Sequence, residues 1–288
     1  MIYRIQTVDI LGMVVAAMQF PVTINSITET EPNVFLLNVC DVYHAQKNFT
    51  VSIGGKDYKI KSVNYPSEII VTGSDPITIS EFEMYRPFYF HGTPIQTGVE
   101  LNKKTQSKKV PMIWFMEQYS ELRNTSNIVP IDRKINGQLY FLSNGDPVNW
   151  TTDISFEDGI KPMARLQEHF ERQLIEMNWI FNTEIPFEYT FKTYHAFGVF
   201  IVNKGMPEQL WTDKLSGVEM DFTSLEVFFD ALCKNSCPTE VCCLKIISFY
   251  FYAGCQKHGD AQGSDNGCFR FLVFQFFIIQ IEVMVVMP

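Results

Sequence analysis

The chain has 288 residues, of which 46% are hydrophobic and 19% are charged, and its formal net charge is −9. This length and composition are typical of a globular protein with one large domain or two of ordinary size, with enough apolar residues to bury a core. The negative charge argues against a protein that wraps a nucleic-acid backbone, because neutralising phosphates requires clustered Lys and Arg residues. The only basic cluster is interpreted as a solvated loop: Lys103, Lys104, Lys108 and Lys109.

Residues 10–18 form a short apolar stretch near the start of the chain. Its length suits the apolar part of a secretory signal peptide, but Asp9 offsets Arg4 beside it and no small-x-small cleavage site follows. We therefore expect a buried first helix or strand here, with a signal peptide as the alternative.

Residues 20–100 are predicted to be rich in β-strands. Turn sequences separate short segments of strand-like composition at residues 34–40, 49–53, 58–63 and 68–71. Gly54-Gly55 between two of these segments predicts a tight hairpin, because glycine adopts positive φ without steric cost. Residues 77–90 add a further strand or two, and this spacing is typical of a small antiparallel sandwich or barrel.

Residues 95–110 are polar and Lys-rich, and they are predicted to be a linker or an exposed loop. Apolar strands are expected at residues 111–117 and 138–142. The polar stretch of about 20 residues between these strands is longer than compact hairpins favour. It is therefore expected to protrude or to pack on a neighbouring molecule.

The clearest helix of the chain is predicted to follow. Apolar residues recur at steps of three and four and form one stripe: Ile160, Met163, Leu166, Phe170, Leu174, Met177 and Phe181. Asp158 is the expected N-cap, and Pro162 falls in the first turn, where its missing N–H costs little. One or two strands over residues 189–202, broken near Gly198, come next. Residues 218–229 begin with strand alternation and end with helical spacing.

Together these elements predict an α+β fold in three parts. A small antiparallel β module is expected over residues 1–100. A mixed sheet with one main amphipathic helix on one face is expected over residues 101–231. An atypical tail, apolar and rich in Cys and Phe, follows over residues 232–288.

The tail differs sharply in composition from the rest of the chain. Cys40 is the only cysteine before residue 232, and six follow it: Cys233, Cys237, Cys242, Cys243, Cys255 and Cys268. Two apolar runs, residues 241–255 and 269–287, lie in the same region. Three interpretations stay open: a membrane hairpin, a β-rich segment buried in the fold or in an oligomer, and the product of a shifted reading frame. Polar residues inside the second run disfavour the membrane hairpin: Arg270, Gln275, Gln280 and Glu282.

A metal site in the tail is the first chemistry that the sequence suggests, since His258 accompanies the six cysteines. Structural zinc sites present paired C-x2-4-C knuckles, and only Cys233 and Cys237 approach that spacing. Adjacent Cys242 and Cys243 project in diverging directions on a regular backbone. We therefore expect neither a metal site nor disulfides, and we interpret the cysteines as small buried hydrophobes or incidental thiols.

Catalytic groups are the second chemistry to consider. Four acidic residues cluster before the predicted helix: Asp146, Asp153, Glu157 and Asp158. Acid/base catalysis needs two carboxyls in different environments, but acidic residues also gather at helix N-termini for capping and dipole reasons, which we favour here. The histidines are scattered without ligand spacing: His44, His91, His169, His195 and His258. No nucleophile elbow, P-loop or dinucleotide motif occurs, so we expect no catalytic residue and no cofactor.

The order of segments before the tail resembles structural proteins of tailed bacteriophages, particularly of phages of gut bacteria. The resemblance is carried by FTVSIGGKDYKIKSVNYPSEIIVTG, FHGTPIQTGVE, KVPMIWFME, QLYFL, IKPMARLQEHFERQLIEM and LSGVEMDF, in this order. Residues 111–229 look like the sheet-plus-helix unit of tail-terminator and neck ring proteins. The resemblance implies a ring-forming connector between head and tail, with no catalytic residues to carry over.

From this resemblance we expect a non-enzymatic virion component that is assembled in the cytoplasm of the bacterial host and acts as an oligomeric connector or tail ring subunit. Its expected partners are copies of itself and neighbouring virion proteins, without specific nucleic-acid readout and without a membrane. An acidic charge suits a lumen through which DNA slides. Subunit contacts are predicted through exposed aromatic residues, Trp114, Phe115 and Tyr119, and through a protruding loop at residues 118–137.

Two alternative functions remain open at this point. The first alternative is a bacterial envelope or membrane-associated binding protein, in which the apolar runs of the tail would form the anchor. The second is a hydrolase that would use Asp146 or Asp153, and it predicts one pocket that holds both carboxylates.

Overall fold

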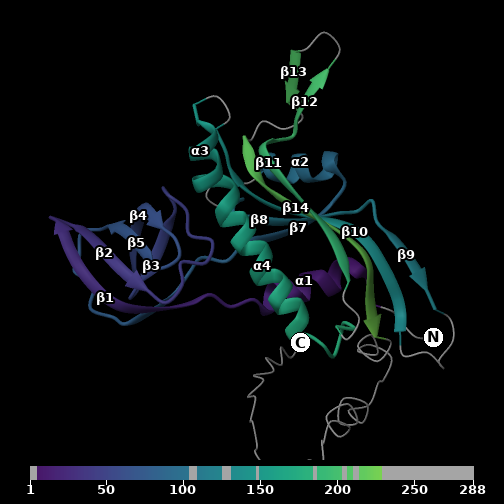
Figure 1. The fold of residues 1–288 in the computed structure, drawn as a ribbon, viewed down its shortest axis with the longest axis horizontal. Helices are drawn as coiled ribbons and strands as arrows, with labels where there is room; N and C mark the ends of the chain where they lie inside the picture. The colour runs from purple at the N-terminus through teal and green to yellow at the C-terminus, as the bar shows by residue number, and fades with distance from the viewer. Residues whose placement is uncertain are drawn as a thin grey trace, which may run out of the picture. The chain divides into compact units, whose positions relative to one another are not determined.

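The computed structural model describes residues 5–103, 109–124, 131–146, 149–183, 187–202, 206–209 and 214–228 (Figure 1). The chain divides into two units, Met1–Cys243 and Leu244–Pro288, and every described residue belongs to the first. The predictions for residues 232–288, including those for the six cysteines of the tail and for His258, concern residues outside this description.

The fold is α+β, as predicted, with an antiparallel N-terminal sheet and a mixed second sheet. The N-terminal sheet consists of β1 (Pro21–Glu31), β2 (Val34–Val39), β3 (Thr50–Ile53), β4 (Lys56–Asn64), β5 (Glu68–Thr72) and β6 (Glu81–Glu83). Its strand order is β3-β4-β5-β2-β1-β6, every pair is antiparallel, and β3 also lies against β6. The sheet therefore curves round on itself as a small barrel, which encloses apolar side chains such as Leu37, Val51 and Ile60.

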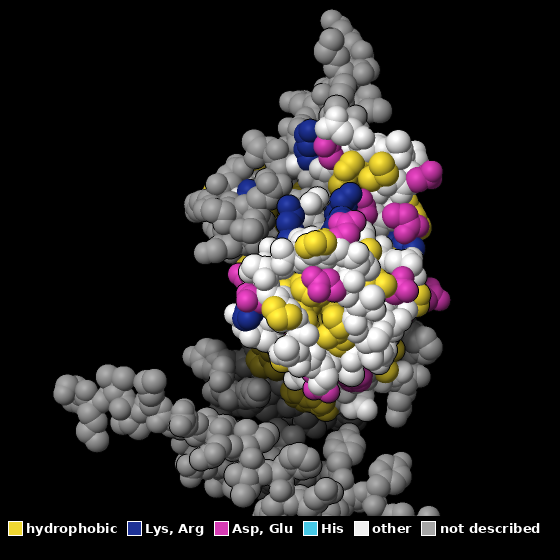
Figure 2. Space-filling view, turned by 90° about the vertical axis from the view of Figure 1, so that its left-hand side faces the viewer, with side chains coloured by type: hydrophobic (Ala, Val, Ile, Leu, Met, Phe, Trp, Pro, Cys, Tyr) yellow, Lys and Arg dark blue, Asp and Glu magenta, His cyan; other side chains and the backbone are white. Residues whose placement is uncertain are grey.

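The hairpin predicted at Gly54-Gly55 is confirmed. β3 pairs with β4 directly across this turn, and the two glycines have φ values of 62° and 76°. Positive φ at both central residues is the geometry of a type I′ turn, whose twist matches that of the flanking strands. On the outer face of the barrel that Figure 2 shows, hydrophobic side chains lie among polar and acidic ones.

The apolar stretch near the start of the chain forms helix α1 (Thr7–Ala17), one of the two forms expected there. Ile10, Leu11 and Val14 are fully buried. The helix packs against α4 (Lys161–Glu176) and against the second sheet, so its apolar side chains belong to the main core.

The second sheet consists of β7 (Phe88–Gly92), β8 (Met112–Met116), β9 (Ser120–Arg123), β10 (Ile131–Asn144), β11 (Glu188–Phe197) and β14 (Leu215–Phe228). Its order is β11-β14-β10-β8-β7, and β9 pairs with the first half of β10. β7 runs parallel to β8, while the other pairs are antiparallel, so the sheet is mixed. β7 comes from the range 1–100 and connects that part of the chain to this sheet. β12 (Val199–Val202) and β13 (Met206–Gln209) form a separate pair.

The predicted main helix is present, but it begins earlier than expected. A continuous helical run consists of α3 (Thr152–Ser155), a π-helical turn η2 (Phe156–Ile160) and α4. The N-cap is Thr151, whose hydroxyl accepts a hydrogen bond from the N–H of Ile154 at 3.3 Å. The assignment of Asp158 as N-cap is therefore wrong, because a helical turn already precedes it.

Gln46 compensates for Pro162 in the first turn of α4. A proline inside a helix leaves the carbonyl of the residue four positions earlier without its usual donor. Here that carbonyl belongs to Asp158, and it accepts a hydrogen bond from Nε2 of Gln46 at 2.9 Å. Oε1 of Gln46 accepts from the hydroxyl of Ser143, so one buried side chain joins the helix to β10.

The apolar stripe of α4 covers one face of the second sheet (Figure 1). Met163, Leu166 and Phe170 are fully buried on this face. The ring of Phe170 meets that of Phe141 on β10 edge-to-face, with centroids 5.6 Å apart. The apolar residues that recur every three or four positions in this helix are therefore the ones that pack on the sheet.

Three predictions of local structure are wrong. Part of the expected linker forms helix α2 (Pro94–Lys103), which buries Thr97 and Leu101. The expected long loop contains β9, which pairs with an early-starting β10. The last strand, β14, does not end helically: a bulge with φ of 56° at Ser224 interrupts its alternation and so produces the helical spacing.

Candidate functional site

The residues predicted to form a subunit interface lie mainly in the core. Trp114 and Phe115 are on β8, between β7 and β10, and their exposed fractions are 1% and 0%. Trp114 stacks on Tyr140 with ring centroids 4.8 Å apart, and Phe115 contacts Tyr119, which is half-buried. The expectation that Trp114 and Phe115 are exposed is wrong, because apolar clusters cover both faces of this interior strand.

The acidic residues before the main helix have separate surroundings. Asp146 accepts hydrogen bonds from Asn149 at 2.6 Å and from Lys214 at 3.3 Å, and these bonds hold its pKa below the ordinary value. Asp153 is exposed in the first turn of α3. Burial raises the pKa of Asp158. Since Asp146 is engaged by its neighbours and Asp153 faces solvent, these two do not form the shared pocket that the hydrolase alternative requires.

Of the described histidines, His91 and His195 lie apart from the others, whereas His44 and His169 both contact Phe20. His91 contacts Glu117 and the ring of Tyr89, and His195 contacts Ser155. Within the described ranges, no group of three or more His, Cys, Asp or Glu side chains is arranged to hold a metal ion. Cys40, the one cysteine in these ranges, is exposed.

His44 is fully buried where the loop after β2 meets α4. Its Nε2 donates to the carbonyl of Tyr85 at 2.8 Å, which leaves Nδ1 without a hydrogen-bond partner in the described part of the chain. The ring of Phe20 contacts both His44 and His169, with centroid distances of 4.7 Å and 4.8 Å. Burial lowers the pKa of His44 to about 4, and it also lowers the pKa of His169.

The free energy of unfolding is expected to fall by about 3 kcal/mol between pH 7 and pH 4 through His44 alone. Unfolded His44 takes up its proton near the ordinary pKa of 6.5, whereas the folded protein resists protonation down to about pH 4. Stability is therefore complete above pH 6.5 and is lost as the pH falls through this window. Urea unfolding across this range checks the prediction. His44→Gln, which keeps a donor towards Tyr85, should lose this part of the slope, and equal slopes in both proteins would contradict the assignment.

A buried ionic cluster joins α1, β9 and β10. Arg133 and its neighbour Asp132 are both completely buried, with 2.7 Å between Nε and Oδ2. Nη1 of Arg133 donates to Glu121 and to the hydroxyl of Thr7, each at 3.2 Å. Burial pushes the pKa of Glu121 upwards, but hydrogen bonds from Thr7 and Arg123 outweigh it, so the pKa lies below its ordinary value. This cluster was not predicted, because Thr7 and Glu121 are distant along the chain from the adjacent pair Asp132 and Arg133.

The sheet face opposite α4 carries an aromatic and ionic row across five strands. Residues that face one another in neighbouring strands are Phe90, Trp114, Tyr140, Glu219 and Lys192. Glu219 is buried and accepts hydrogen bonds from Lys192 at 2.7 Å and from the hydroxyl of Tyr194. The bond to Glu219 is the main reason that the pKa of Lys192 is raised. Both oxygens of Glu219 are occupied, so it acts as a structural counter-ion. In the sequence, Glu219 alternates with apolar residues of β14, and this pattern was the one sign that it lies on the sheet face opposite them.

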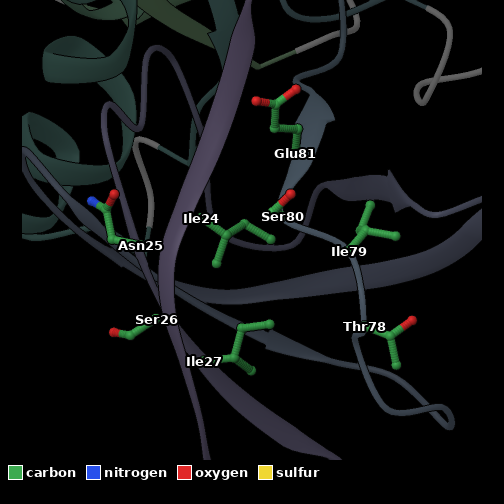
Figure 3. A pocket seen from close by; sticks show the side chains of 8 residues that line it. All are labelled: Ile24, Asn25, Ser26, Ile27, Thr78, Ile79, Ser80 and Glu81. Atoms are coloured by element: carbon green, nitrogen blue, oxygen red, sulfur yellow. The ribbon is translucent and has the colours of Figure 1, made fainter.

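A groove of about 500 Å³ opens beside β1 in the N-terminal sheet (Figure 3). The contact between β1 and β6 ends with a hydrogen bond from the N–H of Ile24 to the carbonyl of Ser80 at 2.7 Å, and a register shift follows. Ile24 and Ile27 point from β1 towards residues 78–81, whereas Asn25 points away. An apolar floor beside an open strand edge suits an extended peptide segment rather than bond chemistry.

No known protein-family model, curated protein or solved structure matches this chain. Of the helices described above, none is long and apolar enough to cross a membrane.

Proposed function

We propose that the protein is a non-enzymatic structural subunit of a tailed-bacteriophage particle. In this role it acts as a ring-forming head–tail connector or tail component, through contacts with copies of itself and with neighbouring virion proteins. The observation that carries the proposal is that large hydrophobic side chains on several separate elements are exposed to solvent.

These exposed side chains are spread over both sheets and over the helices. Ile95, exposed by 76%, and Val99 are four residues apart on α2 and so share one face of that helix. Leu122 on β9 is exposed by 67%. Further exposed hydrophobic side chains are Ile27, Ile154, Phe156, Ile175, Trp179 and Phe191. A ring subunit touches two neighbours and therefore needs at least two separate contact surfaces, which this distribution supplies.

The architecture supports the same proposal. Helix α4 lies on one face of the mixed second sheet, which is the arrangement that the resemblance to tail-terminator and neck ring proteins implies. The net charge of −9 suits a channel that DNA passes without sticking.

Electron microscopy of the purified full chain tests the proposal. We expect closed rings of uniform diameter at high protein concentration. Leu122→Ser and Ile95→Ser each remove one exposed apolar side chain without opening the core, and at least one of them should reduce the fraction of closed rings. Thr28→Ser, on the exposed half of β1, serves as the matched control. Single subunits at every attainable concentration would count against a ring-forming role.

A further inference from the structure

Strand β11 leaves one long edge of the second sheet open. It spans ten residues and pairs with β14 along one side, and none of the described strands pairs with its other side. Side chains on both of its faces are exposed, among them Glu188, Thr190, Phe191 and Lys192. A long, exposed edge of this kind is a template for pairing with another strand.

We infer that two copies of the chain join through β11, in antiparallel pairing about a two-fold axis at Thr190, so that their second sheets form one continuous sheet. The inference rests on the proposed function in taking the partner to be a second copy of this chain. Facing residues of an antiparallel pair lie on the same side of the sheet, so the axis must pass through a residue position.

With the axis at Thr190, the strand is complementary to itself. Glu188 faces Lys192 of the second copy, Tyr189 faces Phe191, and Thr190 faces its own equivalent. The two-fold axis repeats the first two pairs. Opposite charges, aromatic pairs and threonine pairs are the cross-strand combinations that stabilise antiparallel sheets.

Neighbouring registers lack this complementarity. An axis at Lys192 places two ammonium groups opposite each other, which is unfavourable. An axis at Phe191 sets Lys192 opposite Thr190 and Glu188 opposite Tyr194, with no directly facing ion pair. The charge pattern of the strand therefore selects the register at Thr190.

The existing contacts of these side chains are compatible with the pairing. Lys192 donates to Glu219 and lies 3.6 Å from Asp221, yet its side chain remains 45% exposed, and an ammonium group has three donors. The hydroxyl of Tyr189 donates to Glu171 at 2.9 Å, which fixes the ring beside α4. Phe191 is 44% exposed on the same face, so pairing with a second copy covers an aromatic surface that is otherwise in water.

A two-fold contact of this kind closes after two copies. A ring that contains it needs a second, different contact, and the exposed apolar residues of α2 and β9 provide surfaces for one. A closed assembly of this kind has dihedral symmetry and two equivalent ends, so β11 pairing and a polar head–tail ring are alternative assemblies of the same chain.

Cysteine cross-linking of the full chain tests the inference. Thr190→Cys places two thiols opposite each other at a Cα separation of about 4.5–5.5 Å, which a disulfide can bridge. Thr193→Cys is the matched control on the same exposed strand, because its two copies are about 20 Å apart in this register. After mild oxidation we expect a covalent dimer with Thr190→Cys only. Mass spectrometry should show the tryptic peptide joined to itself at position 190.

Charge reversal gives an independent measurement. Glu188→Lys sets two lysines opposite each other twice, and we expect the dimer to dissociate roughly tenfold more readily, or more, by sedimentation. Asp57→Lys makes the same charge change on exposed β4 and should leave association unchanged.

The outcomes separate the two proposals. If the wild-type chain associates but Thr190→Cys links no better than Thr193→Cys, the inference about β11 is overturned while the proposed function stands. If the specific dimer forms but no larger assembly does, the contact is supported and the ring role fails. A strict monomer that gives no specific cross-link overturns both.

Discussion

Replacing Gly217 with alanine is expected to lower the free energy of unfolding by about 4 kcal/mol or more. Gly217 lies on β14 with φ of 156°, and a Cβ atom there meets the carbonyl oxygen of Phe141 at 2.0 Å. The same Cβ atom would lie 3.1 Å from the Cα of Leu142. These are backbone atoms of β10, so the clash is relieved only by separating the two central strands of the second sheet.

Denaturant unfolding of Gly217→Ala beside Gly55→Ala checks this prediction. Gly55 also has positive φ, 76°, but nothing lies within 4 Å of the position of its Cβ. Its substitution should therefore cost only the backbone strain, about 1–2 kcal/mol. If the two variants lose the same free energy, the close approach of β10 and β14 at Gly217 is not as described.

Removing the carboxylate of Asp132 is expected to cost about 3–5 kcal/mol, because it leaves the completely buried guanidinium of Arg133 without its closest counter-charge. Glu121 contacts Arg133 at 3.2 Å and compensates only in part, since it also pairs with Arg123. The register shift between Ile131 and Arg133 is what allows the two adjacent side chains to bond to each other.

A double variant separates charge from packing in this cluster. Asp132→Ala alone should be less stable than Asp132→Ala combined with Arg133→Met, because the second change removes the uncompensated charge and retains an apolar stem. Thermal and urea unfolding measure both. If Asp132→Ala lowers the free energy of unfolding by less than about 1 kcal/mol, the ion pair is not buried, or another group takes the place of Asp132.

Elements with a clear local pattern were predictable from the sequence. The turn Gly54-Gly55 fixes its hairpin through positive φ, and the stripe of α4 follows the 3.6-residue period because one face packs on the sheet. Strand β1 was not located, because only its first four residues alternate between exposed and buried, and residues 25–31 are all exposed. Helix α2 buries only Thr97 and Leu101 among its described side chains, too few to give a stripe.

The candidate site was less predictable than the fold. Trp114 and Phe115 have the chemistry of interface residues, but the strand order that buries β8 is a long-range property. The complementarity of β11 was readable in the segment Glu188-Tyr189-Thr190-Phe191-Lys192. Its meaning depends on β11 lying at the edge of the sheet, which only the structure shows.

The molar mass of the full-length chain in solution tests self-association most directly. Light scattering coupled to size exclusion, over a series of protein concentrations, should show species at even multiples of 33.3 kDa that grow with concentration. Glu188→Lys should shift this distribution towards the monomer. A constant mass of 33.3 kDa for the wild-type chain at every concentration would contradict the proposal that the protein works by contact with copies of itself.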